Sequence, residues 1–94
     1  MEFEWDESKA VENEDKHGIS FRQAVEIWSA PHLEVDHIAY SEDGEKRNAT
    51  MGWIENKLFV AIWTKRNQKI RLISVRRARK NEEKVFLEKI QDPD

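Results

Sequence analysis

The chain has 94 residues, 38% hydrophobic and 37% charged, which is enough for one compact domain with a modest, aromatic-rich core. It has no cysteine, which excludes disulfides, thiolate nucleophiles and cysteine-based metal sites and favours a reducing cytoplasm. We see neither a signal peptide nor an apolar run long enough to span a bilayer, so we expect a single cytoplasmic domain over residues 1–94 with no membrane contact.

The N-terminal residues predict a short strand and a helix. Residues 3–5 alternate apolar and acidic side chains as a strand does, and Asp6 is typical of a helix N-cap. Gly18 suits the left-handed position that follows a helix end, which predicts a helix over residues 7–17.

A second helix is predicted to begin at Ser20. Ser20 and Gln23 have the spacing of a capping box, in which each side chain accepts a hydrogen bond from a backbone N–H at the helix start. Pro31 should end this helix. Its apolar residues have the i, i+3, i+4, i+7 spacing of one buried stripe, namely Phe21, Ala24, Val25 and Trp28.

The second half of the chain changes to strand periodicity. Residues 33–38 could be a short extended piece, and residues 41–44 have the composition of a turn. Three segments rich in β-formers follow, at 47–54, 58–64 and 68–75, separated by the polar stretches 55–57 and 65–67. They predict an antiparallel meander. Residues 58–63 are apolar at both parities, as in a central strand covered on both faces.

Residues 79–91 return to helical periodicity, with Phe86, Leu87 and Ile90 on one side. The order of elements predicts an α+β fold. Two N-terminal helices and a C-terminal helix are expected to pack on a mostly antiparallel sheet of three to four strands.

The net charge of −3 conceals a strong asymmetry along the chain. Residues 1–46 hold four Lys and Arg against thirteen Asp and Glu, whereas residues 65–80 hold eight Lys and Arg and no acid. Clustered cations attract phosphates, which favours nucleic acid as a partner. Two alternatives stay open: the basic stretch could serve solubility, or it could bind an acidic protein or the acidic region of the chain itself.

Arg71 and Arg76 are the most informative cations of this stretch, because arginine binds phosphate oxygens through two parallel hydrogen bonds. Residues five apart in a regular strand point to opposite faces. The two arginines can therefore share a face only if Arg76 lies beyond the strand end or a bulge intervenes.

The first predicted helix carries a polar face formed by Lys9, Asn13, Lys16 and His17. His17 could act as a general acid or base, since its unperturbed pKa lies near neutrality. It could equally serve the helix end, where the dipole favours a cation and Gly18 follows. No paired-carboxylate or histidine spacing indicates a metal, and we expect neither a metal site nor another cofactor.

Two long motifs carry a resemblance to a known family. The first runs Phe3-Glu4-Trp5-Asp6-x-x-Lys9-x-x-x-Asn13-x-x-Lys16-His17-Gly18-Ile19-x-Phe21, and the second Thr64-x-Arg66, then Ile70-Arg71-x-Ile73-Ser74-x-Arg76-x-Ala78, with Glu82 four residues on. Together they resemble the opening and closing motifs of BrnT toxins. Where that family often has tyrosine near the end of the second motif, this chain has Phe86.

The resemblance implies a RelE-like fold, ribonuclease activity that arrests translation, and a hetero-oligomer with a BrnA-like ribbon-helix-helix antitoxin. Our hypothesis is a metal-independent endoribonuclease with His17, Arg71 and Arg76 as catalytic residues and Lys16, Arg66 and Lys80 as RNA-binding residues. Arg71 and Arg76 would stabilise the charged phosphorane, and His17 or Lys16 would assist proton transfer or orientation. The alternative function is a non-catalytic protein that binds a DNA-binding antitoxin and acts in transcriptional repression.

Overall fold

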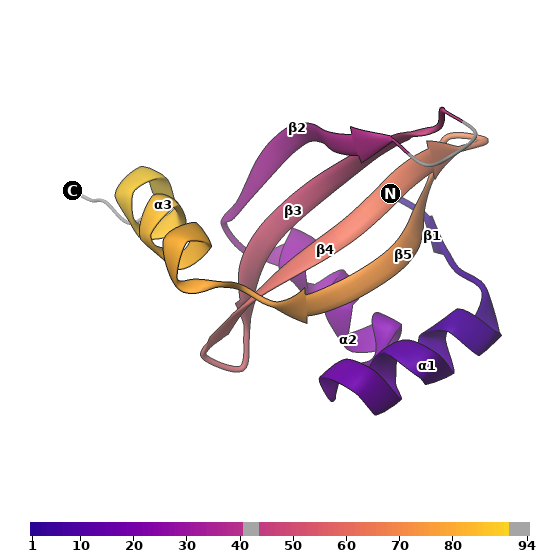
Figure 1. Ribbon diagram of the computed structural model, residues 1–94, viewed down its shortest axis with the longest axis horizontal. Coiled ribbons are helices and arrows are strands. Elements are labelled where there is room, and N and C mark those ends of the chain that lie inside the picture. Colours follow the sequence, from indigo (N-terminus) through magenta and orange to yellow (C-terminus); the bar gives the residue numbers. More distant parts are fainter. Residues whose placement is uncertain (41–43, 91–94) are drawn as a thin grey trace.

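The computed structural model describes residues 1–40 and 44–90, with the side chains of residues 35–40 excepted. One mixed five-stranded sheet has the strand order β1-β5-β4-β3-β2. Helices α1 and α2 cover one face, and α3 lies against one end of the other face (Figure 1). The strands are β1 Phe3–Glu4, β2 His32–Tyr40, β3 Lys46–Ile54, β4 Lys57–Arg66 and β5 Lys69–Arg77. The helices are α1 Glu7–His17, α2 Phe21–Ala24, the 3-10 helix η1 Val25–Ser29 and α3 Lys80–Ile90.

The α+β class and the antiparallel meander are confirmed, but the predicted strand number is too low. β2 is a full strand that pairs with β3 from His32 opposite Gly52 onward, rather than a short extended piece. β1 pairs in parallel with β5, with Phe3 opposite Ile70, which makes the sheet mixed. The predicted turn at 41–44 lies outside the described residues except for Gly44, which has φ +84°.

Two tight turns connect the central strands. Glu55 and Asn56 form the β3–β4 turn, and Asn67 and Gln68 form the β4–β5 turn; all four have positive φ, between 50° and 67°. Positive φ at both central residues is the type I′ geometry that matches the twist of a hairpin. The second turn was predicted at residues 65–67, which is wrong, because β4 continues through Arg66.

The first helix follows its predicted bounds, and its capping is confirmed. The Asp6 carboxylate accepts hydrogen bonds from the backbone N–H groups of Ser8 and Lys9, and Gly18 ends the helix with φ +72°. The capping box of Ser20 and Gln23 is also present.

The second helix was predicted as one helix up to Pro31, which is wrong after Ala24, where the chain tightens into η1. Tight packing on β3 accounts for the change. A Cβ on Gly52 would lie 2.8 Å from Cγ2 of Ile27. The tighter helix makes Ile27 fully buried, whereas Val25 and Trp28 of the predicted stripe are only half-buried.

Apolar side chains of β4 alternate between two cores. Phe59 and Ala61 pack with Phe21 and Ile27 under α2 and η1. Leu58 and Val60 pack on the opposite face with Phe86 of α3. This confirms the central strand predicted from residues 58–63. Leu87 does not join the apolar side of α3 as predicted, because its side chain is 42% exposed.

Candidate functional site

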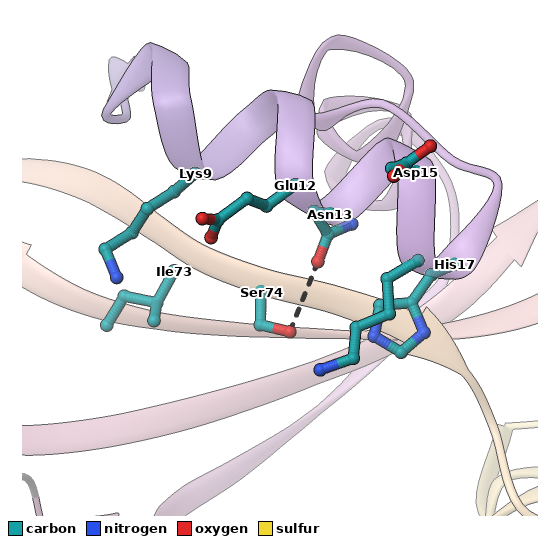
Figure 2. Close-up of a pocket in the computed structure, with 8 residues that line it drawn as sticks. Lys9, Glu12, Asn13, Asp15, His17, Ile73 and Ser74 are labelled. Atoms are coloured by element: carbon teal, nitrogen blue, oxygen red, sulfur yellow. Dashed lines mark hydrogen bonds between the residues drawn. The ribbon is translucent and has the colours of Figure 1, made fainter.

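A pocket of about 370 Å³ lies between α1 and β5. Figure 2 shows Lys9 and His17 at its two ends, with Asn13 and Ser74 between them. The lining consists of Lys9, Glu12, Asn13, Asp15, Lys16, His17, Ile73 and Ser74. The polar face predicted for the first helix is thus turned toward β5, and two of the six predicted site residues lie in this pocket.

A smaller hollow of about 150 Å³ adjoins this pocket, because Lys9 and Ile73 line both. Its lining brings Arg66 and Arg71, two more of the predicted site residues, to the same side of the molecule. The lining consists of Asp6, Lys9, Glu45, Arg47, Arg66, Arg71, Leu72 and Ile73. We call the two hollows together the β5 groove. It runs from Arg47 at one end to His17 at the other.

Asn13 fixes α1 to the edge of β5. Its side-chain amide donates hydrogen bonds to the carbonyl oxygens of Val75 (3.0 Å) and Ile19 (3.2 Å). Its Oδ1 accepts hydrogen bonds from the Val75 N–H (3.0 Å) and from the Ser74 hydroxyl (3.3 Å) (Figure 2). One side chain therefore pairs with both backbone groups of Val75, as a neighbouring strand would. Asn13 is the buried member of the predicted polar face.

A β-bulge puts Arg71 and Arg76 on the same face of the sheet. The register of β5 against β4 shifts at Ile73, which is the extra residue. Arg71 pairs with Thr64 and Arg76 with Val60, and residues four apart on β4 share a face. One of the two conditions stated for a shared face is therefore met. At about 3.3 Å per residue, however, the two arginines lie about 13 Å apart along the sheet.

Many cations of the 65–80 stretch already have partners in the chain. Among the described residues, four ion pairs join them to glutamates: Arg66 with Glu45 (3.0 Å), Lys69 with Glu2 (3.8 Å), Arg71 with Glu4 (3.2 Å) and Arg76 with Glu82 (2.8 Å). Binding to the acidic region of the chain, one of the open alternatives for this stretch, thus occurs in part. A phosphate must compete with these carboxylates or bind to donors that they leave unused.

Arg76 and Lys80 lie away from the β5 groove. Arg76 lines a mostly apolar hollow of about 210 Å³ between the sheet and α3, together with Met51 and Val85. Lys80 is exposed at the first residue of α3. The structure therefore separates Arg76 from His17 and Arg71.

Sequence reasoning did not single out Arg47, which lines the β5 groove beside Arg66 and Arg71. The strand around Arg47 was predicted, but its register was not. Only the pairing of β3 with β4 reveals which face Arg47 occupies.

A model of the family described as ribonuclease toxin, BrnT, of type II toxin-antitoxin system matches residues 5–82. The chain belongs to the BrnT family. Its match includes every predicted site residue, from Lys16 to Lys80. BrnT proteins are ribonuclease toxins of type II toxin-antitoxin systems, which implies an RNA target and an antitoxin partner. A search of curated proteins found no match to this chain.

Two further properties of this BrnT chain concern membranes and metals. No helix in the part of the chain that the structure describes is long and apolar enough to cross a membrane. Within residues 1–40 and 44–90, no three His, Asp or Glu side chains are grouped so that they could hold a metal ion.

Glu82 of this BrnT chain makes a close ion pair with Arg76. Its two carboxylate oxygens accept hydrogen bonds from the Arg76 guanidinium at 2.9 and 2.8 Å, and one also accepts from the Arg79 backbone N–H at 2.8 Å. The hydrogen bonds from Arg76 lower the pKa of Glu82 from 4.5 to about 2. The pair links the end of β5 to the first turn of α3.

Glu82→Gln is expected to lower the free energy of unfolding by about 1–2 kcal/mol at pH 7, a value reduced for the partial exposure of the pair. Because the folded-state pKa is the lower one, this stability is complete above pH 4.5 and is lost as the pH falls toward 2. Urea unfolding between pH 7 and pH 2.5 measures it. The wild type and the variant should converge at low pH, and Glu83→Gln, one residue away, should differ little from wild type. A difference in free energy of unfolding between wild type and Glu82→Gln that stays constant with pH would contradict this role.

Proposed function

We propose that the chain is a metal-independent endoribonuclease that cleaves RNA in the β5 groove. The ribose 2′-OH attacks the adjacent phosphorus, the bond to the 5′-oxygen breaks, and the products carry a 2′,3′-cyclic phosphate and a 5′-OH. The single observation that supports this proposal most is the groove itself, which brings His17 and Lys16 to one side of Lys9 and Arg71 to the other.

Each side chain has a proposed task in this reaction. The reacting phosphate lies in the larger hollow, between Lys9 and His17 and beside Ser74. Arg71 reaches it from the adjoining hollow. His17 takes the proton from the 2′-OH or returns one to the leaving 5′-oxygen, and Lys16 orients the phosphate. Arg71 stabilises the charged phosphorane, because preorganised cations act most strongly where charge develops. Glu4 holds a single nitrogen of Arg71, which leaves other donors of the guanidinium for phosphate.

Arg66, Arg76 and Lys80 bind the RNA strand on either side in this proposal. Arg76 was predicted as catalytic, but both of its terminal nitrogens are held by Glu82, and it lines the hollow beside α3 rather than the β5 groove. We therefore assign Arg71 to the reaction and Arg76 to strand binding.

Cleavage of end-labelled RNA by the purified, antitoxin-free chain in EDTA tests the proposal. We expect cleavage to 2′,3′-cyclic phosphate and 5′-OH ends, and none of an all-deoxy substrate. Arg71→Ala should lower the cleavage rate about 100-fold, the usual effect of removing one group that stabilises transition-state charge. Arg76→Ala should mainly raise KM, and Arg22→Ala, an exposed arginine of α2, should change neither. Free 3′-OH ends, or full activity of Arg71→Ala, would refute this mechanism.

A specific observation favours a second function, that of a non-catalytic partner of a DNA-binding antitoxin. The hollow beside α3 has an apolar lining that includes Met51, Val60 and Val85, and exposed Arg79 and Lys80 lie at the adjacent start of α3. Such a surface suits an acidic segment with apolar side chains, as a BrnA-like ribbon-helix-helix antitoxin would offer. An adjacent reading frame that encodes such a protein would support a hetero-oligomer and repression of transcription. Absence of RNA cleavage by the wild type would favour this function alone.

We also propose a cellular location and a fold family for the chain. We place the protein in the cytoplasm, as one toxin domain over residues 1–94 that arrests translation. The RelE-like fold implied by the resemblance belongs to the same proposal. An antiparallel meander with two N-terminal helices on one face supports it.

A further inference from the structure

Arg47 lies in a cross-strand row on the face of the sheet that carries Arg71. In the β3–β4 register Asn48 pairs with Trp63, so Arg47 follows beside Thr64, and Thr64 pairs with Arg71 on the next strand. The Thr64 hydroxyl donates a hydrogen bond to the Lys46 carbonyl oxygen at 2.7 Å, which holds the ends of β3 and β4 together. Two guanidinium groups thus flank one small side chain.

Arg47 differs from Arg66 and Arg71 in having no ion-pair partner among the residues that the structure describes. Its Nε is buried and has no hydrogen-bond acceptor among the residues that the structure describes. Arg66 and Arg71, in contrast, both contact glutamates. No carboxylate in the described part of the chain compensates the charge of this guanidinium, and its terminal nitrogens can serve an anion in the hollow that Arg47 lines. Phosphate suits this geometry, because it accepts two parallel hydrogen bonds from a guanidinium.

The carboxylates that line this end of the groove, Asp6 and Glu45, already accept hydrogen bonds from other residues. The Asp6 carboxylate caps α1 through the Ser8 N–H (2.8 Å) and hydroxyl (2.7 Å). Glu45 accepts hydrogen bonds from Arg66 at 3.0 and 3.3 Å. The lining of the hollow has two carboxylates, both with partners, against the four cations Lys9, Arg47, Arg66 and Arg71, and Glu4 beside the hollow pairs with Arg71, so the balance stays positive by one charge. Its remaining charge favours an anion.

The length of the groove indicates more than one phosphate. Lys9 and His17 are eight residues apart on α1, or about 12 Å at 1.5 Å per residue. Arg47 lies in the hollow beyond Lys9, on the side away from His17. A single phosphate cannot contact both ends, whereas successive phosphates of one strand can.

We propose that Arg47 anchors a subsite for an RNA phosphate next to the one that reacts. The subsite rests on the proposed function for its place in the RNA, and it sets how many nucleotides the protein holds. Arg47 contributes affinity for the strand, and it does not take part in the chemical step.

Binding of non-cleavable 2′-deoxy oligonucleotides to the full chain tests this subsite, with fluorescence anisotropy as the readout. A dinucleotide has a single phosphodiester, and a hexanucleotide reaches both hollows. Arg47→Ala should weaken hexanucleotide binding about tenfold, as expected for the loss of a charge-assisted hydrogen bond, and should leave dinucleotide binding unchanged. The slope of log K against log salt should fall by about 0.7, the contribution of one phosphate on a single strand.

Three controls make the result specific. Lys57→Ala removes an equal charge at the exposed β3–β4 turn and should leave both oligonucleotides unaffected. Arg47→Lys keeps the charge but not the planar fork of two terminal nitrogens, and should lose part of the hexanucleotide affinity. Urea unfolding of Arg47→Ala should show only a small loss of stability, from the packing of its half-buried stem, because no hydrogen bond or ion pair is lost with it.

Several outcomes would overturn the subsite: equal weakening of both oligonucleotides, no weakening of either, or tighter binding of a glutamate-rich peptide than of the hexanucleotide by the wild type. Failure of the subsite can be told from failure of the proposed function, because deoxy substrates report binding without cleavage. Length-dependent binding without RNA cleavage would refute only the enzyme. Cleavage without a length-dependent effect of Arg47 would refute only the subsite.

Discussion

Asn13→Leu is expected to lower the free energy of unfolding by about 3–5 kcal/mol, because each buried backbone group left without a partner costs about 1–3 kcal/mol. Leucine is close to asparagine in size but pairs with neither the N–H nor the C=O of Val75, and it also leaves the Ile19 carbonyl without its donor. Urea denaturation followed by circular dichroism measures the loss.

Two companion variants separate this role from helix propensity. Glu14→Leu, at the next and exposed position of α1, should change stability by less than about 0.5 kcal/mol. Asn13→Asp keeps the acceptor for the Val75 N–H but places a carboxylate against the Val75 carbonyl. Its deficit should shrink as the pH falls and the carboxyl becomes a donor. A loss below about 1 kcal/mol for Asn13→Leu would mean that the edge of β5 does not depend on this amide.

Phe86→Ala is expected to have a comparable effect, about 3–5 kcal/mol, as is usual when a buried phenyl ring is removed. Phe86 is fully buried and is the residue through which α3 enters the core formed by Ala49, Met51, Leu58 and Val60. Trp53 packs edge-on against it, with ring centroids 5.8 Å apart. We expect α3 to separate from the sheet. Urea unfolding measures the loss in free energy of unfolding, and a red shift of tryptophan emission reports the exposure of Trp53.

Leu87→Ala is the matched control for Phe86→Ala, since Leu87 is the next residue of the same helix and is 42% exposed. It should change stability by less than about 0.5 kcal/mol. If both variants lost the same amount, helix propensity rather than burial would hold α3 in place.

Local signals made α1 predictable to the residue. Asp6 and Gly18 act within one helical turn of the ends that they define, so their effect is visible in the sequence alone. The strands of the meander were predictable for a similar reason, since β-formers and polar turns alternate along residues 46–77. The change from α2 to η1 was not, because it depends on contact between Ile27 and Gly52 on β3.

The candidate site was predictable in its residue types but not in its arrangement. The motifs contained Asn13, His17 and Arg71, yet the contact between Asn13 and Val75 spans 62 positions and leaves no local signal. The bulge at Ile73 was stated only as a condition for Arg71 and Arg76 to share a face. Arg47 was missed because its face depends on strand register, which non-local pairing decides.

The Asn13 amide also limits how copies of this chain could associate through their strands. One side of the sheet ends in the two-residue β1 and in the stretch of β5 whose backbone Asn13 occupies, so it offers little template for a further strand. β2, nine residues long, forms the other edge of the sheet. If β2 paired with β2 of a second copy, the backbone groups of that edge would be hydrogen-bonded in both chains and could not bind a further strand. Growth would stop at a closed dimer, without propagation into a fibre.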